Sequence, residues 1–316
     1  MANYENYARV KARIEERRQR ALAEADGRNY EVRERSALIA EIDRELEGTG
    51  LKIFSAACRG EDITPLKERN IALLTARKKE LKLLGLPEDY TEVHYHCKKC
   101  SDTGFIDGFI TCSCFKEELI TENIKSSGIG ALIETQSFDN FNPDVYKGSP
   151  EIKERAAMNL LAAKRYAKTF AKNGENMLLY GDTGTGKTHI STAIAKEAIT
   201  HGYDVVYDSV QNVVADFEAD RFKSNYGTNE PKSTKYLECD LLILDDLGSE
   251  FITQFSLACL YNLLNTRQNK RLSTIISTNL SPDEISEQYQ DRIASRIFSK
   301  NTTILCFEGT DQRVIS

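Results

Sequence analysis

Residues 181–188, GDTGTGKT, have the glycine spacing and the final Lys-Thr pair of a loop that binds the phosphates of a nucleotide. An apolar stretch, NMLLY, precedes this loop, and a helical sequence, HISTAIAKEAI, follows it. Glycines let backbone amides close around phosphate oxygens, and the N-terminus of the next helix adds partial positive charge. A plain glycine turn is the alternative, but it would not require these flanks. The residues expected to bind ATP are Gly181, Asp182, Thr183, Gly184, Thr185, Gly186, Lys187, Thr188 and His189.

Within this loop, Lys187 is expected to reach the β and γ phosphates and Thr188 to hold Mg²⁺. A second apolar stretch, LLILDD at residues 241–246, ends in two aspartates. Phosphate-binding loops work with a carboxylate at the end of a strand, which holds the hydrated Mg²⁺. Asp245 has that place, and Asp246 follows where a hydrolysing enzyme has the base that orients water. The alternative for Asp246 is a solvated loop residue.

Half of the eight cysteines lie in HCKKCSDTGFIDGFITCSC, residues 96–114. A CxxC and a CxC pair, separated by eleven residues, suit the tetrahedral thiolate coordination of Zn²⁺. Residues 103–110 predict a β-hairpin with its turn at Asp107-Gly108. The CxC spacing is short, so His94 or His96 in place of one thiolate stays open, as does a set of buried or redox-active cysteines. The expected zinc ligands are Cys97, Cys100, Cys112 and Cys114.

We expect this zinc to be structural, because four thiolates leave no open position and no acid or base partner is evident. A segment of about 30 residues cannot bury enough apolar surface to fold alone, so the metal would supply the missing stability. Lys98, Lys99 and Lys116 would offset the negative charge of the site. The other cysteines are expected in the core: Cys58, Cys239, Cys259 and Cys306.

The 316 residues suffice for two domains, and 41% hydrophobic with 28% charged residues is an ordinary globular balance. No apolar run approaches the about 20 residues of a membrane helix, and the charged N-terminus lacks the apolar centre of a signal peptide. We therefore expect a cytoplasmic protein with no membrane partner. The net charge of −6 argues against coating nucleic acid by bulk electrostatics, although a local basic groove remains open.

The elements that position these residues fall into four segments. Residues 1–90 predict three or four helices, and residues 91–126 a zinc-binding module that ends in a short helix from about 115. Residues 127–150 read as a linker, and residues 151–316 alternate helices with apolar strands, which predicts an α/β fold with a parallel sheet flanked by helices. The expected strands are 176–180, 204–208, 241–244, 273–277 and 302–307.

Four further segments make the chain recognisable: SFDNF (137–141), STN (277–279), DRIASRIF (291–298) and GTDQR (309–313). With the phosphate loop and LLILDD, they resemble the bacterial helicase-loader ATPases, the DnaC/DnaI family of AAA+ proteins. The resemblance covers residues 135–316, and the cysteine segment looks like the zinc-bearing part of the DnaI branch. The first 80 residues match only in helical character. The resemblance implies an AAA+ ATPase domain over 151–316.

By this resemblance, Asn279 corresponds to sensor 1, which senses the γ-phosphate and the attacking water, and Arg313 to a sensor 2-like arginine. Phe138 and Phe141 lie where the family frames the adenine. Many AAA+ relatives have Glu at the position of Asp246. The shorter carboxylate favours a slow, switch-like ATPase.

Arg296 corresponds to the arginine finger that reaches the ATP of a neighbouring subunit, and Arg292 is a second candidate. Being four residues apart, the two cations share a helix face and repel each other, which suits an anion that arrives from a partner. The alternative is a pair of solvated surface arginines. A finger supplied in trans requires that the protein self-associates through its ATP sites.

Residues 220–236 interleave basic and aromatic side chains, the pattern by which proteins hold single-stranded nucleic acid. A solvated loop is the alternative. The residues concerned are Arg221, Phe222, Lys223, Tyr226, Lys232, Lys235 and Tyr236.

The function that these features favour is an ATP-dependent loader of the replicative DNA helicase, which binds ATP as an assembly switch and contacts helicase and single-stranded DNA. Two alternatives stay open. One is an IstB-like helper ATPase of transposition, and the other is a zinc-dependent DNA-binding regulator whose phosphate loop is only a folding element.

Overall fold

Five parallel strands form the sheet that carries the phosphate loop, in the order β4-β5-β6-β3-β7. The computed structural model describes residues 2–146, 150–171, 174–222, 231–309 and 311. The inner strands are apolar and almost wholly buried, as expected of a sheet covered on both faces. All five predicted strands are confirmed, with small shifts at their ends. The strands are β3 (Asn176–Gly181), β4 (Val205–Ser209), β5 (Leu241–Leu247), β6 (Ser273–Thr278) and β7 (Thr302–Phe307).

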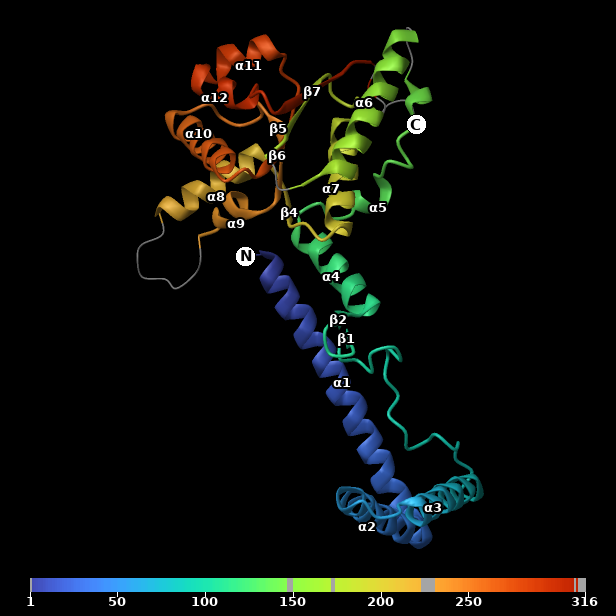
Figure 1. Cartoon of the computed structure of the whole chain (residues 1–316). Coiled ribbons are helices and arrows are strands. Elements are labelled where there is room, and N and C mark those ends of the chain that lie inside the picture. The colour runs from blue at the N-terminus through green and yellow to red at the C-terminus, as the bar shows by residue number, and fades with distance from the viewer. Residues whose placement is uncertain (1, 147–149, 172–173, 223–230, 310, 312–316) are drawn as a thin grey trace. The chain divides into compact units, whose positions relative to one another are not determined.

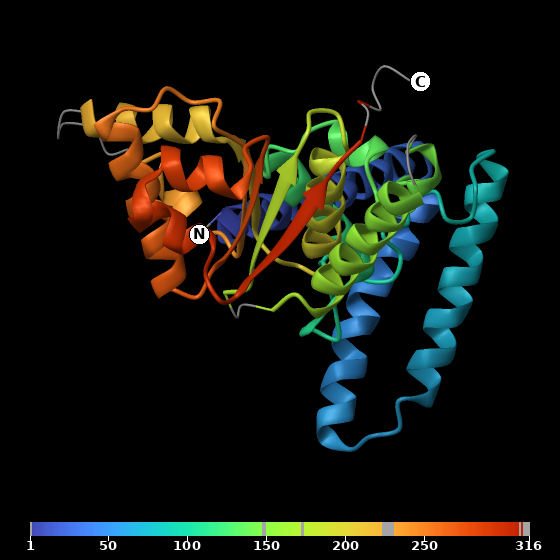
Figure 2. The same ribbon diagram turned by 90° about the horizontal axis from the view of Figure 1, so that it is seen from above.

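Helices cover both faces of this sheet (Figures 1 and 2), so the predicted α/β fold is confirmed. One core joins the sheet to α6 and α7 through residues such as Met177 and Ile194. The opposite core joins it to α8–α12 through residues such as Leu178 and Leu263. Alternation along β3 sends neighbouring side chains to opposite cores. The helices are α6 (Pro150–Thr169), α7 (Lys187–Thr200), α8 (Val210–Phe222), α9 (Thr234–Glu238), α10 (Gln254–Asn269), α11 (Pro282–Gln288) and α12 (Gln290–Ile297).

The sheet belongs to a unit that comprises Met1–Val10 and Lys116–Ser316. Three short elements precede α6 in it: α4 (Ser113–Ser126), α5 (Leu132–Thr135) and the 3-10 helix η1 (Pro143–Val145). Helix α4 confirms the helix predicted from about residue 115. The buried Asn6 amide donates to Asn123 Oδ1 (2.8 Å) and to Ser126 Oγ (2.6 Å), which fixes the C-terminal end of α4.

The second unit, Lys11–Phe115, contains most of α1 (Ala2–Arg35), α2 (Ala37–Arg59), α3 (Thr64–Leu83) and the hairpin strands β1 (Phe105–Ile106) and β2 (Ile110–Thr111). The Ser36 side chain caps α2, and Gly60 ends it in the left-handed conformation, with a φ of +71°. The predicted group of three or four helices is confirmed. The finer domain boundaries at 90, 126 and 150 remain predictions.

A buried polar network joins the three helices of this unit. Asp43 accepts from Arg33 Nε (2.8 Å) and from Arg77 Nε (2.7 Å), and only 6% of its surface is exposed. Arg77 also donates to Asn29 Oδ1 (2.8 Å) and Thr91 Oγ1 (2.7 Å). The network ties α1, α2, α3 and the chain after α3 together.

The prediction that the four remaining cysteines lie in the core is partly wrong. Cys239 and Cys259 are buried, but Cys58 is exposed and Cys306 is half-buried. Cys306 lies on β7, an edge strand, where one side of the chain has no neighbouring strand to cover it. Among the described residues, no helix is long and apolar enough to cross a membrane.

Candidate functional site

The phosphate loop connects β3 to α7 at the carboxyl edge of the sheet. Its glycines Gly181, Gly184 and Gly186 have φ angles of +130°, +76° and +93°, which other residues rarely adopt. A side chain at Gly181 would collide with the carbonyl oxygen of Phe307 on β7. One at Gly186 would come within 2.9 Å of the Phe141 ring. The loop therefore needs glycine both for its turn and for close packing.

Lys187, the first residue of α7, lies inside this loop. Its Nζ donates to the backbone carbonyls of Gly181 (2.5 Å) and Asp182 (2.6 Å) and to Asn279 Oδ1 (2.8 Å). These three acceptors are neutral, so none of them cancels the positive charge of the lysine. The contact with Asn279 brings the residue predicted as sensor 1, at the end of β6, to the phosphate loop.

The two predicted carboxylates lie beside this group, at the end of β5. Asp245 accepts hydrogen bonds from the hydroxyls of Tyr207 and Ser277, one at each carboxylate oxygen. Asp246 has a left-handed backbone, with a φ of +59°, at a break in the pairing of β5 with β6. Its Oδ1 lies 3.4 Å from Asn279 Nδ2.

Sequence reasoning missed Tyr207 and Ser277 as partners of Asp245. Burial, together with the charge of Asp245, raises the pKa of Tyr207, so the phenol stays protonated and donates its hydrogen. The side chains of Thr188 and Ser191 lower the pKa of Tyr207, but by less than burial and Asp245 raise it. Ser277 belongs to the STN segment, which was a sequence signal, whereas Tyr207 carried none.

These groups line a cleft of about 390 Å³. It offers an ammonium, a hydroxyl and two carboxylates, which is the donor set that a magnesium triphosphate needs. Thr188 and Asp245 would hold Mg²⁺, and Lys187 would bind the phosphates. When bound, the metal would neutralise charge on the phosphates. The lining residues are Gln136, Thr183, Gly184, Gly186, Lys187, Thr188, His189, Asp245, Asp246, Ser277 and Asn279.

Of the predicted adenine-framing residues, Phe141 packs against the phosphate loop at Gly186. Phe138 and Phe141 are buried in the core shared with α6 and α7. The Phe141 ring meets that of His189 edge to face at 5.3 Å between centroids, and His189 Nε2 lies 2.8 Å from the Ser137 carbonyl oxygen. The adenine role of the two phenylalanines remains a prediction, and Gln136 is the residue of this segment that lines the cleft.

The two candidate finger arginines on α12 have different surroundings. Arg296 donates to Asn265 Oδ1 (2.7 Å) and to the Tyr261 hydroxyl (3.1 Å) on α10. Its guanidinium also stacks over the Tyr261 ring, 4.3 Å from the centroid. Arg292 is exposed. Arg313, the predicted sensor 2-like residue, lies outside the described residues.

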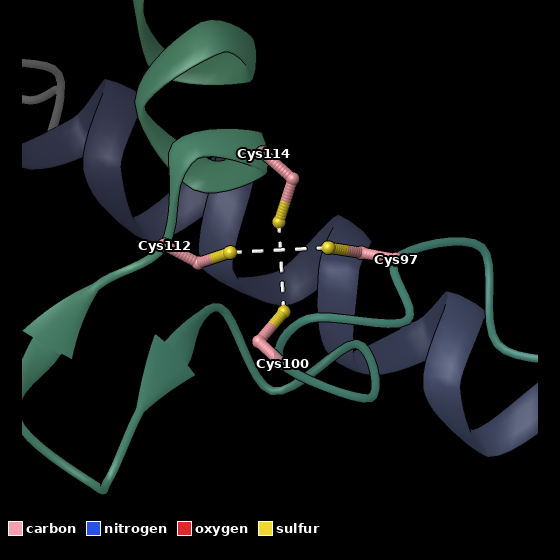
Figure 3. A group of neighbouring side chains, drawn as sticks. All are labelled: Cys97, Cys100, Cys112 and Cys114. Atoms are coloured by element: carbon pink, nitrogen blue, oxygen red, sulfur yellow. Dashed lines mark hydrogen bonds between the residues drawn. The ribbon is translucent and has the colours of Figure 1, made fainter.

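The four predicted zinc ligands converge in the second unit, as Figure 3 shows. All four sulfurs lie within 4.8 Å of one another; Cys97 and Cys112 are 3.8 Å apart, and Cys100 and Cys114 are 3.6 Å apart. Tetrahedral zinc with Zn–S bonds of about 2.3 Å places sulfurs about 3.8 Å apart, whereas a disulfide needs about 2.0 Å. The cage therefore fits Zn²⁺ and not two disulfides.

His94 and His96 are both exposed, and within the described part of the chain the cluster consists of cysteines alone. The hairpin predicted at Asp107-Gly108 is confirmed, with Ile106 paired to Ile110. The buried Asp102, which sequence reasoning missed, accepts the backbone amides of His96 (2.8 Å) and Cys97 (2.9 Å).

The pKa values of two thiols in the cage shift in opposite directions, and burial is the main cause that raises the pKa of Cys114. The backbone amide of Cys100 is the main group that lowers the pKa of Cys97, to about 7, in the absence of metal. Thiolates are the form that binds zinc, so binding of the metal would release protons from these thiols.

Only some residues of the segment predicted to bind nucleic acid are both described and exposed. Tyr236 is fully buried and cannot stack on a base, while Lys235 and Lys232 form ion pairs with Asp216 at 3.2 and 3.4 Å. Lys223 and Tyr226 lie outside the described residues. At the end of α8, Phe222 is 74% exposed, and Arg221 lies over the Phe255 ring at 5.4 Å.

Known proteins are similar to the part of the chain that contains the phosphate loop. The family model of IstB-like ATP binding proteins matches residues 139–300, just over half of the 316 residues. The replicative helicase loader DnaC of Buchnera aphidicola subsp. Acyrthosiphon pisum (strain APS) is 25% identical over 205 residues, 62% of this chain and 80% of that protein.

Two solved structures are similar to part of the chain. The crystal structure of the DnaC helicase loader superposes with a TM-score of 0.45 and 22% identity, covering 54% of this chain and 98% of that one. The crystal structure of DnaI gives a TM-score of 0.45 and 19% identity, over 59% and 95% of the two chains. The family match, together with the phosphate loop and the parallel sheet, leads to the conclusion that the chain belongs to the IstB-like ATP-binding family and is an AAA+ protein similar to the DnaC helicase loaders.

Proposed function

We propose that the chain is an ATP-dependent loader of a replicative DNA helicase in the cytoplasm. The observation that carries this proposal is the cleft in which Lys187, Asp245 and Asn279 meet, in a chain similar to DnaC loaders. Lys187 binds the β and γ phosphates, Thr188 and Asp245 hold Mg²⁺, and Asn279 senses the γ-phosphate.

Hydrolysis in this proposal is slow and serves as a switch. Asp246 orients the attacking water, helped by its contact with Asn279. A protein of this kind assembles with ATP bound and releases its partner after hydrolysis. Arg313 completes the site as a sensor 2-like residue.

The arginine finger acts between copies of the chain. Of the two candidates, Arg292 has the more exposed side chain, while Arg296 is held by Asn265 and Tyr261 of its own chain. These contacts favour Arg292 as the residue that reaches a neighbour's phosphate, with Arg296 fixing the helix on which both lie.

The zinc cage is structural and forms part of the region that contacts the helicase. Single-stranded DNA contacts the end of α8 and the start of α10, where Phe222 is exposed and Arg221 lies beside it. A cation next to exposed aromatic rings gives phosphate pairing and base stacking at one place.

A pull-down with the host's replicative helicase, with and without ATP, tests this function. We expect retention of the helicase by the wild-type chain and an ATP-dependent change in its release, which Lys187→Ala abolishes. Lys196→Ala is the control, because Lys196 also lies on α7 but donates to the Ile133 carbonyl. Absence of any helicase in the retained fraction contradicts the loader function.

The family match also supports an IstB-like helper of transposition as a second candidate. Retention of a transposase in place of the helicase, in the same experiment, identifies that alternative. A zinc-dependent regulator predicts that Lys187→Ala changes neither nucleotide binding nor partner binding.

A further inference from the structure

The phenol of Tyr207 connects the ATP site to the edge of the sheet. Tyr207 lies on β4, and its hydroxyl donates to Asp245, the carboxylate at the end of the neighbouring strand β5. Strand pairing places Ser209 opposite Asp245, so Tyr207 is a diagonal neighbour and its long side chain reaches along the strand. Together with Ser277, it holds both oxygens of Asp245 in place.

The outer edge of β4 at this residue is covered by the chain that follows α4. β4 is an edge strand, so its outer backbone groups have no neighbouring strand. The backbone amide of Tyr207 donates instead to the Ser127 carbonyl oxygen, at 2.7 Å. Gly128 has a φ of +83°, and a side chain there would collide with the carbonyl oxygen of Tyr207. Residues 127 and 128 therefore hold the strand in place through the backbone of this tyrosine.

The corner formed by residues 127 and 128 is itself firmly held. Ser127 is 1% exposed, and its hydroxyl donates to the Ile124 carbonyl at 2.7 Å. The turn of α4 before it is bound by Asn6, whose amide contacts Asn123 and Ser126. A shift of α4 would therefore move the backbone of Tyr207 through its contacts with residues 127 and 128. The same helix carries Cys114 in its first turn.

From these contacts we propose that Tyr207 is a positioning residue for the metal-binding carboxylate Asp245, and that the seating of α4 on β4 sets the Mg²⁺ affinity of the ATP site. The inference rests on the proposed ATP site and adds a residue and a means of regulation to it. Groups that orient a ligand typically change metal affinity about 10- to 100-fold when they are removed. Tyr207 acts through Asp245 and need not touch the nucleotide.

The test is a Mg²⁺ titration of the binding of a fluorescent, non-hydrolysable ATP analogue to the full chain, so that no turnover is needed. Tyr207→Phe removes only the hydroxyl. We expect it to raise the Mg²⁺ concentration for half-maximal effect about tenfold, and to change the affinity without Mg²⁺ less than twofold. Tyr203→Phe is the matched control, because its hydroxyl donates to the Phe170 carbonyl (3.1 Å) in the same core.

A second pair of variants tests the connection to α4. Gly128→Ala should also raise the Mg²⁺ requirement, because its methyl group would push against Tyr207. Gly130→Ala should not, since Gly130 has a similar backbone, with a φ of +57°, but open space around it. Equal behaviour of these two variants overturns the link to α4.

A Mg²⁺ requirement of Tyr207→Phe that is unchanged or lowered overturns the positioning role. Failure of the wild-type chain to bind the analogue at any Mg²⁺ concentration instead overturns the proposed ATP site. The first result concerns a variant and the second the wild-type chain, so the two failures are distinguishable. Thermal melting checks that each variant is folded.

Discussion

Substitution of the two arginines on α12 should separate a structural role from a role between subunits. In Arg296→Ala, the hydrogen bonds to Asn265 and to the Tyr261 hydroxyl are lost, together with the stack on the Tyr261 ring. Two such bonds at about 1 kcal/mol each and a partly exposed cation–π contact of about 0.5–1 kcal/mol sum to about 2.5–3 kcal/mol. Arg296 is half-buried, so contacts with water replace part of this free energy. We therefore expect the free energy of unfolding to fall by about 2 kcal/mol.

For a unit of this size, a loss of that magnitude lowers the melting temperature by roughly 4–8 °C. Arg292→Ala should leave the melting temperature within about 2 °C, because exposed substitutions rarely change stability by more than about 0.5 kcal/mol. It should instead lose most ATP turnover while binding of the nucleotide remains.

Differential scanning calorimetry and ATPase assays over a range of protein concentrations measure both effects. Arg296→Lys is the control, since it retains the charge but loses the planar fork that serves Asn265 and Tyr261 together. Equal melting temperatures for Arg296→Ala and the wild type would refute the structural reasoning. Turnover of Arg292→Ala at the wild-type rate would refute its role as the finger.

Three further outcomes follow from the described contacts. Lys187→Ala should weaken nucleotide binding at least about tenfold, the size of one charge-assisted hydrogen bond, as calorimetric titration would show. Removal of zinc by a chelator should expose residues 90–120 to proteolysis and leave nucleotide binding in the absence of Mg²⁺ unchanged; protection that persists without metal would contradict a structural zinc. Burial alone would raise the pKa of Asp43, but Arg77 and Arg33 outweigh it and lower that pKa. Its stabilisation is therefore complete above the ordinary carboxyl range and is lost as the pH falls below about 4. Asp43→Asn should lower the free energy of unfolding by roughly 2–3 kcal/mol at pH 7. This is less than the loss of a fully buried ion pair would cost, because Arg33 is 43% exposed. Denaturation followed by circular dichroism should show that the stability of this variant depends less on pH.

The parts of this structure that the sequence predicts are those encoded locally. Each strand is a short apolar run, and the glycines of residues 181–188 have a spacing that few other structures need. The cysteine pairs and the Asp107-Gly108 turn are likewise neighbours in the chain. For such features the pattern of residue types is already the structural reason, so the prediction and the structure agree.

The parts that escaped prediction depend on contacts between distant segments. Tyr207 reaches Asp245 only because β4 and β5 are neighbours in the sheet. Tyr236 looked like a base-stacking residue, but its hydroxyl binds Asp208 and Asp216 in the core. Cys58 follows an apolar stretch and is nevertheless exposed. Residue type alone does not reveal such partners.

The conformation of Asp246 bears on the speed expected of this ATPase. Asp is a shorter carboxylate than the Glu that many AAA+ relatives have at this position, so it would hold the water less well and favour slow turnover. The backbone gives a second reason for the same residue. At a φ of +59°, Asp is among the few residues other than glycine that are enriched. The break in the pairing of β5 and β6 at this point therefore favours Asp, while Asn279 approaches its carboxylate from the next strand. The backbone conformation and the proposed slow turnover therefore favour the same side chain at this position.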